Sequence, residues 1–158
     1  MPLPQRKHPR LKNYDYGQCG CYHITICTQG HRRCLSRVIL PQTITDRAQI
    51  QLTHWGNIAE KYIRQIEQVH KGVYLDKFVI MPNHIHMLIF LDKEVSTTIP
   101  RVVQGFKRMT NKDIGQSIWQ ESFYDVVIRN DVMYQCEWNY IDGNPDKWME
   151  DKLYIAEE

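Results

Sequence analysis

The chain has 158 residues, 42% hydrophobic and 24% charged, which suits one packed domain and excludes the disordered and fibrous classes. No apolar run approaches the roughly eighteen residues that a membrane span needs, so we predict a single cytoplasmic domain over residues 1–158 with no membrane partner. The net charge of +2 is unevenly distributed, because residues 1–37 are rich in Lys and Arg and contain one acid, Asp15. This pattern is typical of a protein that binds a polyanion, but a solvated basic face would show it as well.

The predicted elements begin with a strand at residues 22–28, where β-branched and aromatic residues alternate. Apolar residues at helical spacing then predict an amphipathic helix of about eighteen residues over 52–69. Two strand-like runs follow at 73–80 and 84–91. The Pro and Asn between these runs favour a turn, so we expect an antiparallel hairpin.

The second half of the chain predicts a helix over 96–116 and a strand over 123–129. Asp131 is expected to cap a last helix that runs to about residue 144, where Pro145 disfavours continuation. The first six elements follow the order of the ferredoxin-like βαββαβ unit. We therefore predict an α+β fold with two helices on one face of the sheet and the extra C-terminal helix over the other.

The five cysteines are odd in number and contain no C-x-x-C pair, which indicates reduced thiols rather than a disulfide framework. A zinc cluster could be imagined from Cys19, Cys21 and Cys34 with His23 or His31. The spacing of these residues matches no common zinc site. Reduced cysteines are therefore the prediction.

His84 and His86 lie two residues apart in a predicted strand. Side chains alternate along a strand, so both imidazoles project from one face while Ile85 enters the other. Two such imidazoles can share one metal ion. The alternative is an ordinary pair of polar residues on a solvated face.

Tyr140 and Asn144 lie one turn apart on the last predicted helix, with Cys136 a turn before them. A tyrosine in such a helix is more often a packing residue than a catalytic one. If the helix covers the open face of the sheet, however, the Asn144 oxygen can complete the ligand set and Tyr140 lies beside the metal. The neighbouring apolar stripe of Tyr134, Trp138 and Ile141 is expected to dock the helix.

Three runs carry a family resemblance: residues 79–89 (VIMPNHIHMLI), 119–125 (WQESFYD) and 140–145 (YIDGNP). Together they resemble the REP-associated tyrosine transposases. This family belongs to the one-tyrosine HUH class, which is named for its histidine, hydrophobic, histidine triplet. The resemblance extends from residues 14–16 and 22–28 to Trp148, which is nearly the whole chain.

The resemblance implies a divalent metal, magnesium or manganese, held by His84, His86 and the side chain one turn beyond the tyrosine, which is Asn144. It also implies that Tyr140 attacks a DNA phosphate and becomes linked to the new 5′ end, leaving a free 3′ hydroxyl. Glutamine is the commoner residue at the place of Asn144 in the insertion-sequence relatives. Gly143 is a second departure from the family pattern, and we expect it to loosen the turn that presents Asn144.

The implied partner is single-stranded or hairpin DNA, and no Walker motif or G-x-G-x-x-G run indicates a nucleotide cofactor. Two basic segments could neutralise DNA phosphates. One is the N-terminal segment 1–13, which is expected to be flexible. The other lies in the predicted helix 96–116, where an ordinary solvated face is the alternative. The acidic tail is expected at 149–158. The candidate DNA-binding residues are Arg6, Lys7, Arg10, Lys12, Arg101, Lys107, Arg108 and Lys112.

Three functions compete. The first is a DNA-nicking and rejoining transposase that acts on palindromic hairpin repeats through a 5′-phosphotyrosine. The second is a domesticated hairpin-binding protein that no longer cuts, and the third is a metal-dependent hydrolytic nuclease for which Tyr140 is dispensable. Because the connection before the last helix is short, we expect that helix to reach its own sheet, which favours a monomer over a homodimer.

Overall fold

The computed structural model describes residues 11–154 of the chain. Its elements, in chain order, are β1 (Gly20–Cys27), η1 (Gln29–His31), β2 (Ser36–Ile39), β3 (Gln49–Leu52), α1 (His54–Arg64), α2 (Ile66–Val69), β4 (Val73–Ile80), β5 (His84–Leu91), α3 (Ile99–Ile114), β6 (Tyr124–Ile128), α4 (Asp131–Asp142) and η2 (Pro145–Glu150). Within these described residues, the helices are too short or too polar to cross a membrane.

The main sheet has four strands in the order β4-β5-β1-β6, and every neighbouring pair is antiparallel. This is the strand order of the ferredoxin-like unit, so the predicted α+β fold is confirmed. The bounds predicted for β4 and β5 match those observed. β5 is a central strand and is buried at every position except Phe90, which explains why polar residues on it lie out of solvent.

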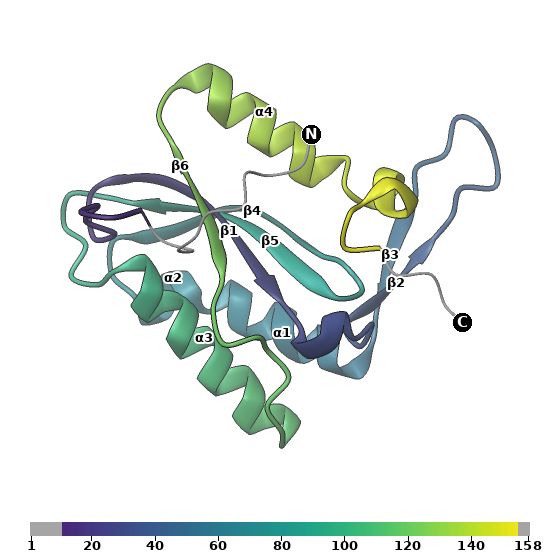
Figure 1. Cartoon of the computed structure of the whole chain (residues 1–158), viewed down its shortest axis with the longest axis horizontal. Helices are drawn as coiled ribbons and strands as arrows, with labels where there is room; N and C mark the ends of the chain where they lie inside the picture. The colour runs from purple at the N-terminus through teal and green to yellow at the C-terminus, as the bar shows by residue number, and fades with distance from the viewer. Residues whose placement is uncertain (1–10, 155–158) are drawn as a thin grey trace.

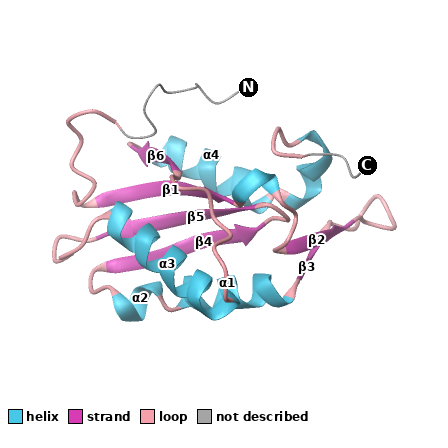
Figure 2. Cartoon of the chain, turned by 60° about the horizontal axis from the view of Figure 1, so that its bottom comes forward, coloured by secondary structure: helices cyan, strands magenta, loops and turns pink. Residues whose placement is uncertain are grey.

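The helices form layers on both faces of the sheet. Helices α1, α2 and α3 lie together below it, whereas α4 lies above it and is followed there by η2 (Figure 1). The turned view in Figure 2 shows the same separation. The core lies between the sheet and the three-helix layer and includes Ile24, Ile85, Met87 and Phe106. Among the described residues, α4 and the short segment η2 therefore cover the other face, which is where the candidate site lies.

Several helix bounds differ from the predictions. Helix α3 covers 99–114 rather than 96–116, and α4 ends at Asp142, so Asn144 lies just beyond this helix rather than on it. The expected eighteen-residue helix consists of two pieces, α1 and α2, separated at Gln65. The first piece begins at His54, because the Thr53 hydroxyl caps it by accepting a hydrogen bond from the Gly56 N–H. Helix α4 is capped by Asn130 rather than Asp131. The Asn130 side-chain oxygen accepts from the Met133 N–H at 2.8 Å, so Asp131 is the first helical residue.

A second, two-stranded sheet made of β2 and β3 was not predicted. Its strands have only four residues each, which is too short for a period-two pattern to stand out. The loop between them reaches the C-terminal part of the chain, where the Ala48 N–H donates to Asp146 Oδ1 at 2.7 Å and Arg47 forms ion pairs with Asp142 and Asp146. This hairpin therefore helps to hold the segment that follows α4.

Helix α4 is attached to the edge strand β4 through several polar contacts and one buried residue. Asp76 is the extra residue of a β-bulge between Leu75 and Lys77, and its carboxylate accepts a hydrogen bond from the Tyr134 hydroxyl. Lys77 donates to Asp142 at 2.7 Å and lies 4.0 Å from the centre of the Trp138 ring. Together with the buried Ile141 side chain, these contacts fix the helix over the sheet.

Gly56 permits the closest approach between α1 and the chain before β2. A Cβ at this position would lie 1.9 Å from the Leu35 carbonyl oxygen. We expect Gly56→Ala to lower the free energy of unfolding by about 1–3 kcal/mol, because the helix would have to move away from this carbonyl.

Gly105→Ala in α3 is the matched control for this prediction. Its Cβ would meet only His70 Nε2 at 3.9 Å, so the better helix propensity of Ala should stabilise the protein by about 0.5–1 kcal/mol. Urea unfolding measures both variants, and equal effects would contradict the packing argument.

Candidate active site

His84 and His86 lie side by side on the face of the sheet that α4 covers. Both side chains are buried, and their ring centroids are 4.7 Å apart. Ile85 between them points into the core on the other face. The strand alternation read from the sequence therefore places both imidazoles at one spot, as predicted.

Tyr140 brings a phenol to the same spot from α4. Its ring centroid lies 5.3 Å from that of His86 and 6.0 Å from that of His23. The residue is 46% exposed, so a ligand in solvent can reach it although it adjoins two buried histidines. The packing alternative does not describe this tyrosine, because half-exposed rings contribute little to a core.

Four buried polar atoms at this spot have no hydrogen-bond partner among residues 11–154. They are His84 Nε2, His86 Nε2, Asn144 Oδ1 and Asp151 Oδ2. Buried polar atoms without partners are rare because each costs about 1–3 kcal/mol. Ligand atoms of His84, His86 and Asp151 all lie within 4.8 Å of one another. Nitrogen and oxygen donors left free in this way fit a divalent cation.

Asp151 was not predicted as part of the site. It lies directly after η2, within the segment expected to be an acidic tail, and its Oδ2 is 3.7 Å from His84 Nε2. The buried Trp148 brings it there by packing with its ring centroid 6.0 Å from that of His84. No spacing rule signals this residue, because a 3-10 turn follows Asn144 and breaks the helical register.

Burial controls the protonation of the two histidines. It lowers the pKa of His84 to about 4, although the Asp151 charge and the Asn144 side chain partly oppose it. Burial likewise lowers the pKa of His86 well below its ordinary value, and the positive forms of His84 and His23 add to the effect. Both imidazoles are therefore neutral at pH 7, which is the form that binds metals.

The phenol of Tyr140 is not activated by its protein surroundings alone. Burial raises its pKa, and the Asp151 carboxylate raises it further. The side chain of Asn144 acts in the opposite direction and lowers the pKa. The phenol therefore stays protonated at neutral pH unless a positive charge is brought to the site.

Asn83 sets the orientation of His84. Its amide nitrogen donates to the carbonyls of Leu153 at 2.7 Å and His31 at 3.3 Å, which leaves its Oδ1 as an acceptor. That oxygen lies 2.7 Å from His84 Nδ1. The imidazole must therefore carry its proton on Nδ1, and the lone pair of Nε2 faces the cluster of free donors.

His86 is oriented by a chain of side chains that reaches α4. Its Nδ1 lies 2.9 Å from the Thr25 hydroxyl and 3.0 Å from His23 Nε2. The other nitrogen of His23 pairs with the Glu137 carboxylate, one turn before Tyr140. A carboxylate, histidine, histidine chain thus links α4, the helix that carries Tyr140, to a candidate metal ligand. Hydrogen bonds of this kind fix the tautomer of metal-binding histidines.

The lowered pKa of His84 predicts a pH dependence of stability in the metal-free protein. In the unfolded chain His84 takes up a proton near pH 6.5, whereas the folded protein resists this until about pH 4. The free energy of unfolding should therefore fall as the pH falls from 6.5 to 4. In His84→Gln this fall should be smaller by about 1–3 kcal/mol. Urea unfolding in EDTA at pH 7.0, 5.5 and 4.5 tests this pH dependence, and His54→Gln at an exposed position is the control. If the free energy of unfolding falls equally with pH in His84→Gln and in wild type, the prediction is wrong.

The candidate DNA-binding residues lie away from this spot or outside the described residues. Arg101, Arg108 and Lys112 are exposed on α3, in the helix layer on the opposite face of the sheet. The Lys107 amine donates to the carbonyls of Gln120, Glu121 and Ser122 and so holds the loop before β6. Lys12 is exposed. The predictions for Arg6, Lys7 and Arg10 fall outside the described residues.

The cysteines do not form a metal cluster. All five are free thiols, and the metal-type group found among residues 11–154 contains His84, His86 and Asp151 but no cysteine. Cys136 is exposed on α4, a turn before Tyr140.

Comparison with known proteins gives both a fold and a family. The structure of the REP associates tyrosine transposase bound to a REP hairpin superposes with a TM-score of 0.66, covering 90% of this chain and 76% of that chain at 19% identity. The chain therefore has the fold of a tyrosine transposase, and the resemblance read from its sequence is confirmed in the fold. No family model matches the chain. An "Uncharacterized protein" of Haemophilus influenzae is 32% identical over 179 residues, which covers 97% of this chain and 95% of the relative. The chain belongs to the same family as this Haemophilus protein.

Proposed function

We propose that the protein is a metal-dependent strand transferase that cuts and rejoins single-stranded DNA at palindromic hairpin repeats through a 5′-phosphotyrosine. The observation that carries this proposal is the meeting of one exposed phenol, Tyr140, with four buried donor atoms that lack partners. A tyrosine nucleophile beside a metal-type donor set is what the chemistry of such a transferase needs.

His84, His86, Asn144 and Asp151 are the residues proposed to hold the metal. Two imidazole nitrogens and two side-chain oxygens suit Mg²⁺ or Mn²⁺, with Mn²⁺ tolerating nitrogen ligands better. When bound, such an ion supplies a Lewis acid that draws electron density from a phosphate oxygen and makes the phosphorus more electrophilic. Asp151 is an addition to the predicted set of His84, His86 and Asn144.

The proposed reaction is a transesterification. The hydroxyl oxygen of Tyr140 forms a bond to phosphorus, and the bond from phosphorus to the 3′ oxygen of the preceding nucleotide breaks. The proton of the phenol leaves through the exposed edge of the ring, and the released 3′ oxygen takes up a proton. One phosphodiester replaces another, so the reverse attack by a 3′ hydroxyl rejoins a strand without a nucleotide cofactor.

The proposed substrate is a hairpin with unpaired flanks. The transposase with the same fold was solved with a REP hairpin. Tyr140 lies half-buried between its own helix α4 and the sheet, and a single strand can reach such a residue better than a duplex can. Tyr140 and the four donor atoms come from one chain, which supports action as a monomer. Arg6, Lys7, Arg10 and Lys12 are proposed to bind the hairpin phosphates, and the α3 residues Arg101, Arg108 and Lys112 could act only on DNA that extends past the sheet.

A denaturing gel tests this proposal directly. The protein is incubated with labelled hairpin DNA that carries unpaired flanks on both sides, with Mn²⁺ or with EDTA. We expect a labelled covalent band with Mn²⁺ and none with EDTA. Cleaved DNA without such a band would indicate a hydrolytic nuclease, and binding without cleavage, repeated on a second hairpin set, would indicate a binding protein that no longer cuts.

The contact between Glu137 and His23 predicts a second result. Glu137→Gln keeps the size of the side chain but removes the charge that holds His23, and through it His86. Hydrogen bonds to a metal ligand from a second residue typically contribute about 10- to 100-fold to metal affinity. We therefore expect Mn²⁺ binding to weaken by about 10-fold, while the melting temperature of the metal-free protein changes little. Calorimetric titration with Mn²⁺ measures this. Asp131→Asn, an exposed acid on the same helix, is the control, and an equal loss in both variants would refute the specific contact.

A further inference from the structure

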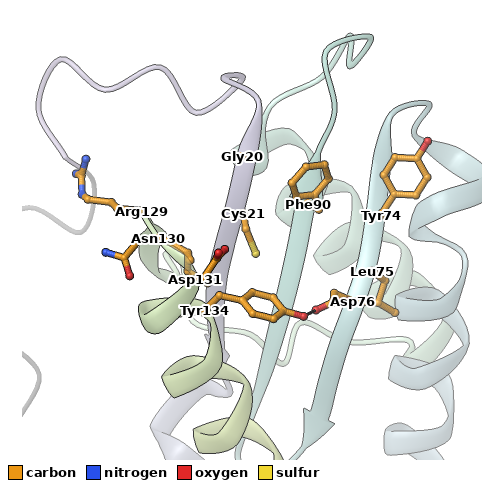
Figure 3. A pocket seen from close by; sticks show the side chains of 11 residues that line it. Gly20, Cys21, Tyr74, Leu75, Asp76, Phe90, Arg129, Asn130, Asp131 and Tyr134 are labelled. Carbon is orange, nitrogen blue, oxygen red and sulfur yellow. Dashed lines mark hydrogen bonds between the residues drawn. The ribbon is translucent and has the colours of Figure 1, made fainter.

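A groove lies on the same face of the sheet as the candidate site, beside the first turn of α4. It has a volume of about 650 Å³ and lies between the first turn of α4 and the neighbouring parts of β1, β4 and β5. Figure 3 shows it, with the hydrogen bond from Tyr134 to Asp76 joining α4 to β4. Hollows of this size are typical of small-molecule and single-nucleotide sites.

The walls of this groove are aromatic. Tyr74 and Phe90 are direct cross-strand partners on β4 and β5, and they are 49% and 42% exposed. The Tyr74 hydroxyl donates to Asp92 at 3.2 Å, which fixes the orientation of that ring. The Cys21 thiol adds to the same surface, because burial and then the Asp76 charge raise its pKa to about 11 and keep it uncharged. Two rigid, exposed rings side by side form a stacking surface.

The charges of the groove suit a base better than a phosphate. Arg129 is the single cation among the lining residues, and its side chain points away from the rings in Figure 3. Asp76 and Asp131 also line the groove and would repel a phosphate. A flat, neutral ring meets no such repulsion, and its amino groups can donate to these carboxylates.

The groove lies a few nucleotides from Tyr140. Tyr134 and Tyr140 are six residues apart on α4, or about 9 Å along the helix axis. His86 and Phe90 are four residues apart on β5, or about 14 Å along the strand. Stacked nucleotides advance by about 3.4 Å each and unstacked ones by more, so the groove lies within about four nucleotides of a phosphate at Tyr140.

We infer that this groove binds one unpaired base of the substrate strand, within about four nucleotides of the phosphate that Tyr140 attacks, by stacking it on Phe90 and Tyr74. This inference rests on the proposed function, since it assumes that a single strand lies over the sheet. It assigns the groove the task of setting which phosphate reaches the phenol.

The test is a double-mutant cycle between protein and DNA. Fluorescence anisotropy measures the affinity of Tyr140→Phe, which cannot cleave, for hairpin DNA with six unpaired nucleotides on each side. The same DNA is made with an abasic site at each flank position in turn. We expect Phe90→Leu to weaken binding of intact DNA by about 10-fold, as removal of one base-stacking ring does, and to have no effect when the abasic site lies at the stacked position. Tyr62→Leu, on α1 in the opposite layer, is the matched control.

The outcomes separate the inference from the proposed function. If Phe90→Leu weakens binding of intact and all abasic DNAs equally, or of none, the groove does not bind a base, even where wild type forms the covalent band. If the cycle is non-additive at one position but wild type forms no covalent band, the groove assignment stands and strand transfer fails. If Tyr140→Phe binds none of these DNAs, both are wrong. Tyr74→Leu, tested in parallel, guards against a result caused by misfolding of one variant.

Discussion

Tyr140→Phe should abolish the covalent protein–DNA band and reduce cleavage of hairpin DNA by at least about 10³-fold, because the phenyl ring has no oxygen to attack phosphorus. Tyr140 is half-exposed and lies outside the hydrophobic core, so the fold should be unaffected by loss of its hydroxyl. The measurement is a denaturing gel with labelled DNA and Mn²⁺, with circular dichroism to compare the folded state.

A second tyrosine makes this experiment specific. Tyr124 is 54% exposed and is the register partner of Thr25, whose hydroxyl contacts His86, so it lies on the same face of the sheet as Tyr140. Tyr124→Phe should keep the covalent band at the wild-type level. A band that survives in Tyr140→Phe, or disappears in Tyr124→Phe instead, would show that the nucleophile has been assigned to the wrong residue.

His86→Ala should eliminate measurable Mn²⁺ binding. The residue supplies one of four free donor atoms, and it is the end of the chain through His23 to Glu137. We expect the affinity to fall by more than the about 100-fold that loss of an outer contact can cause. The stabilisation that Mn²⁺ gives in thermal unfolding should show the same loss. Mn²⁺ at a hundredfold excess over its dissociation constant should stabilise wild type by about 2.7 kcal/mol and His86→Ala not at all.

The control for this experiment is an exposed histidine outside the site. His54 is the first residue of α1, and His54→Ala should bind Mn²⁺ as wild type does. Calorimetry with Mn²⁺ in both variants separates a specific site from ions held loosely by surface histidines. Unchanged binding in His86→Ala would mean that the free donors in the site are not metal ligands.

The sheet and the two histidines could be predicted from local pattern because each depends on short-range rules. The turn residues between two strand-like runs set the bounds of β4 and β5, and alternation at period two placed His84 and His86 on one face. The four-residue strands β2 and β3 gave no comparable signal, since half of their positions are exposed and their pairing depends on each other.

The remaining parts of the candidate site depend on contacts between distant residues. Glu137 meets His23 across 114 positions of sequence, and Asp151 reaches His84 only because Trp148 packs beside it. An acid in a charged C-terminal segment looks like a solvated residue until the packing is known. Tertiary structure, rather than any local rule, therefore decides which acids belong to the site.

The order of these residues along the chain has a consequence for synthesis. The sheet is complete once β6 has formed, but Tyr140, Asn144 and Asp151 all follow it. Since chains fold from the N-terminus as they emerge from the ribosome, the strands that carry the two histidines can pair before the phenol and the oxygen ligands have emerged. A chain that ends before α4 therefore lacks the proposed nucleophile and two of the four proposed metal ligands, even where all four strands of the main sheet are present.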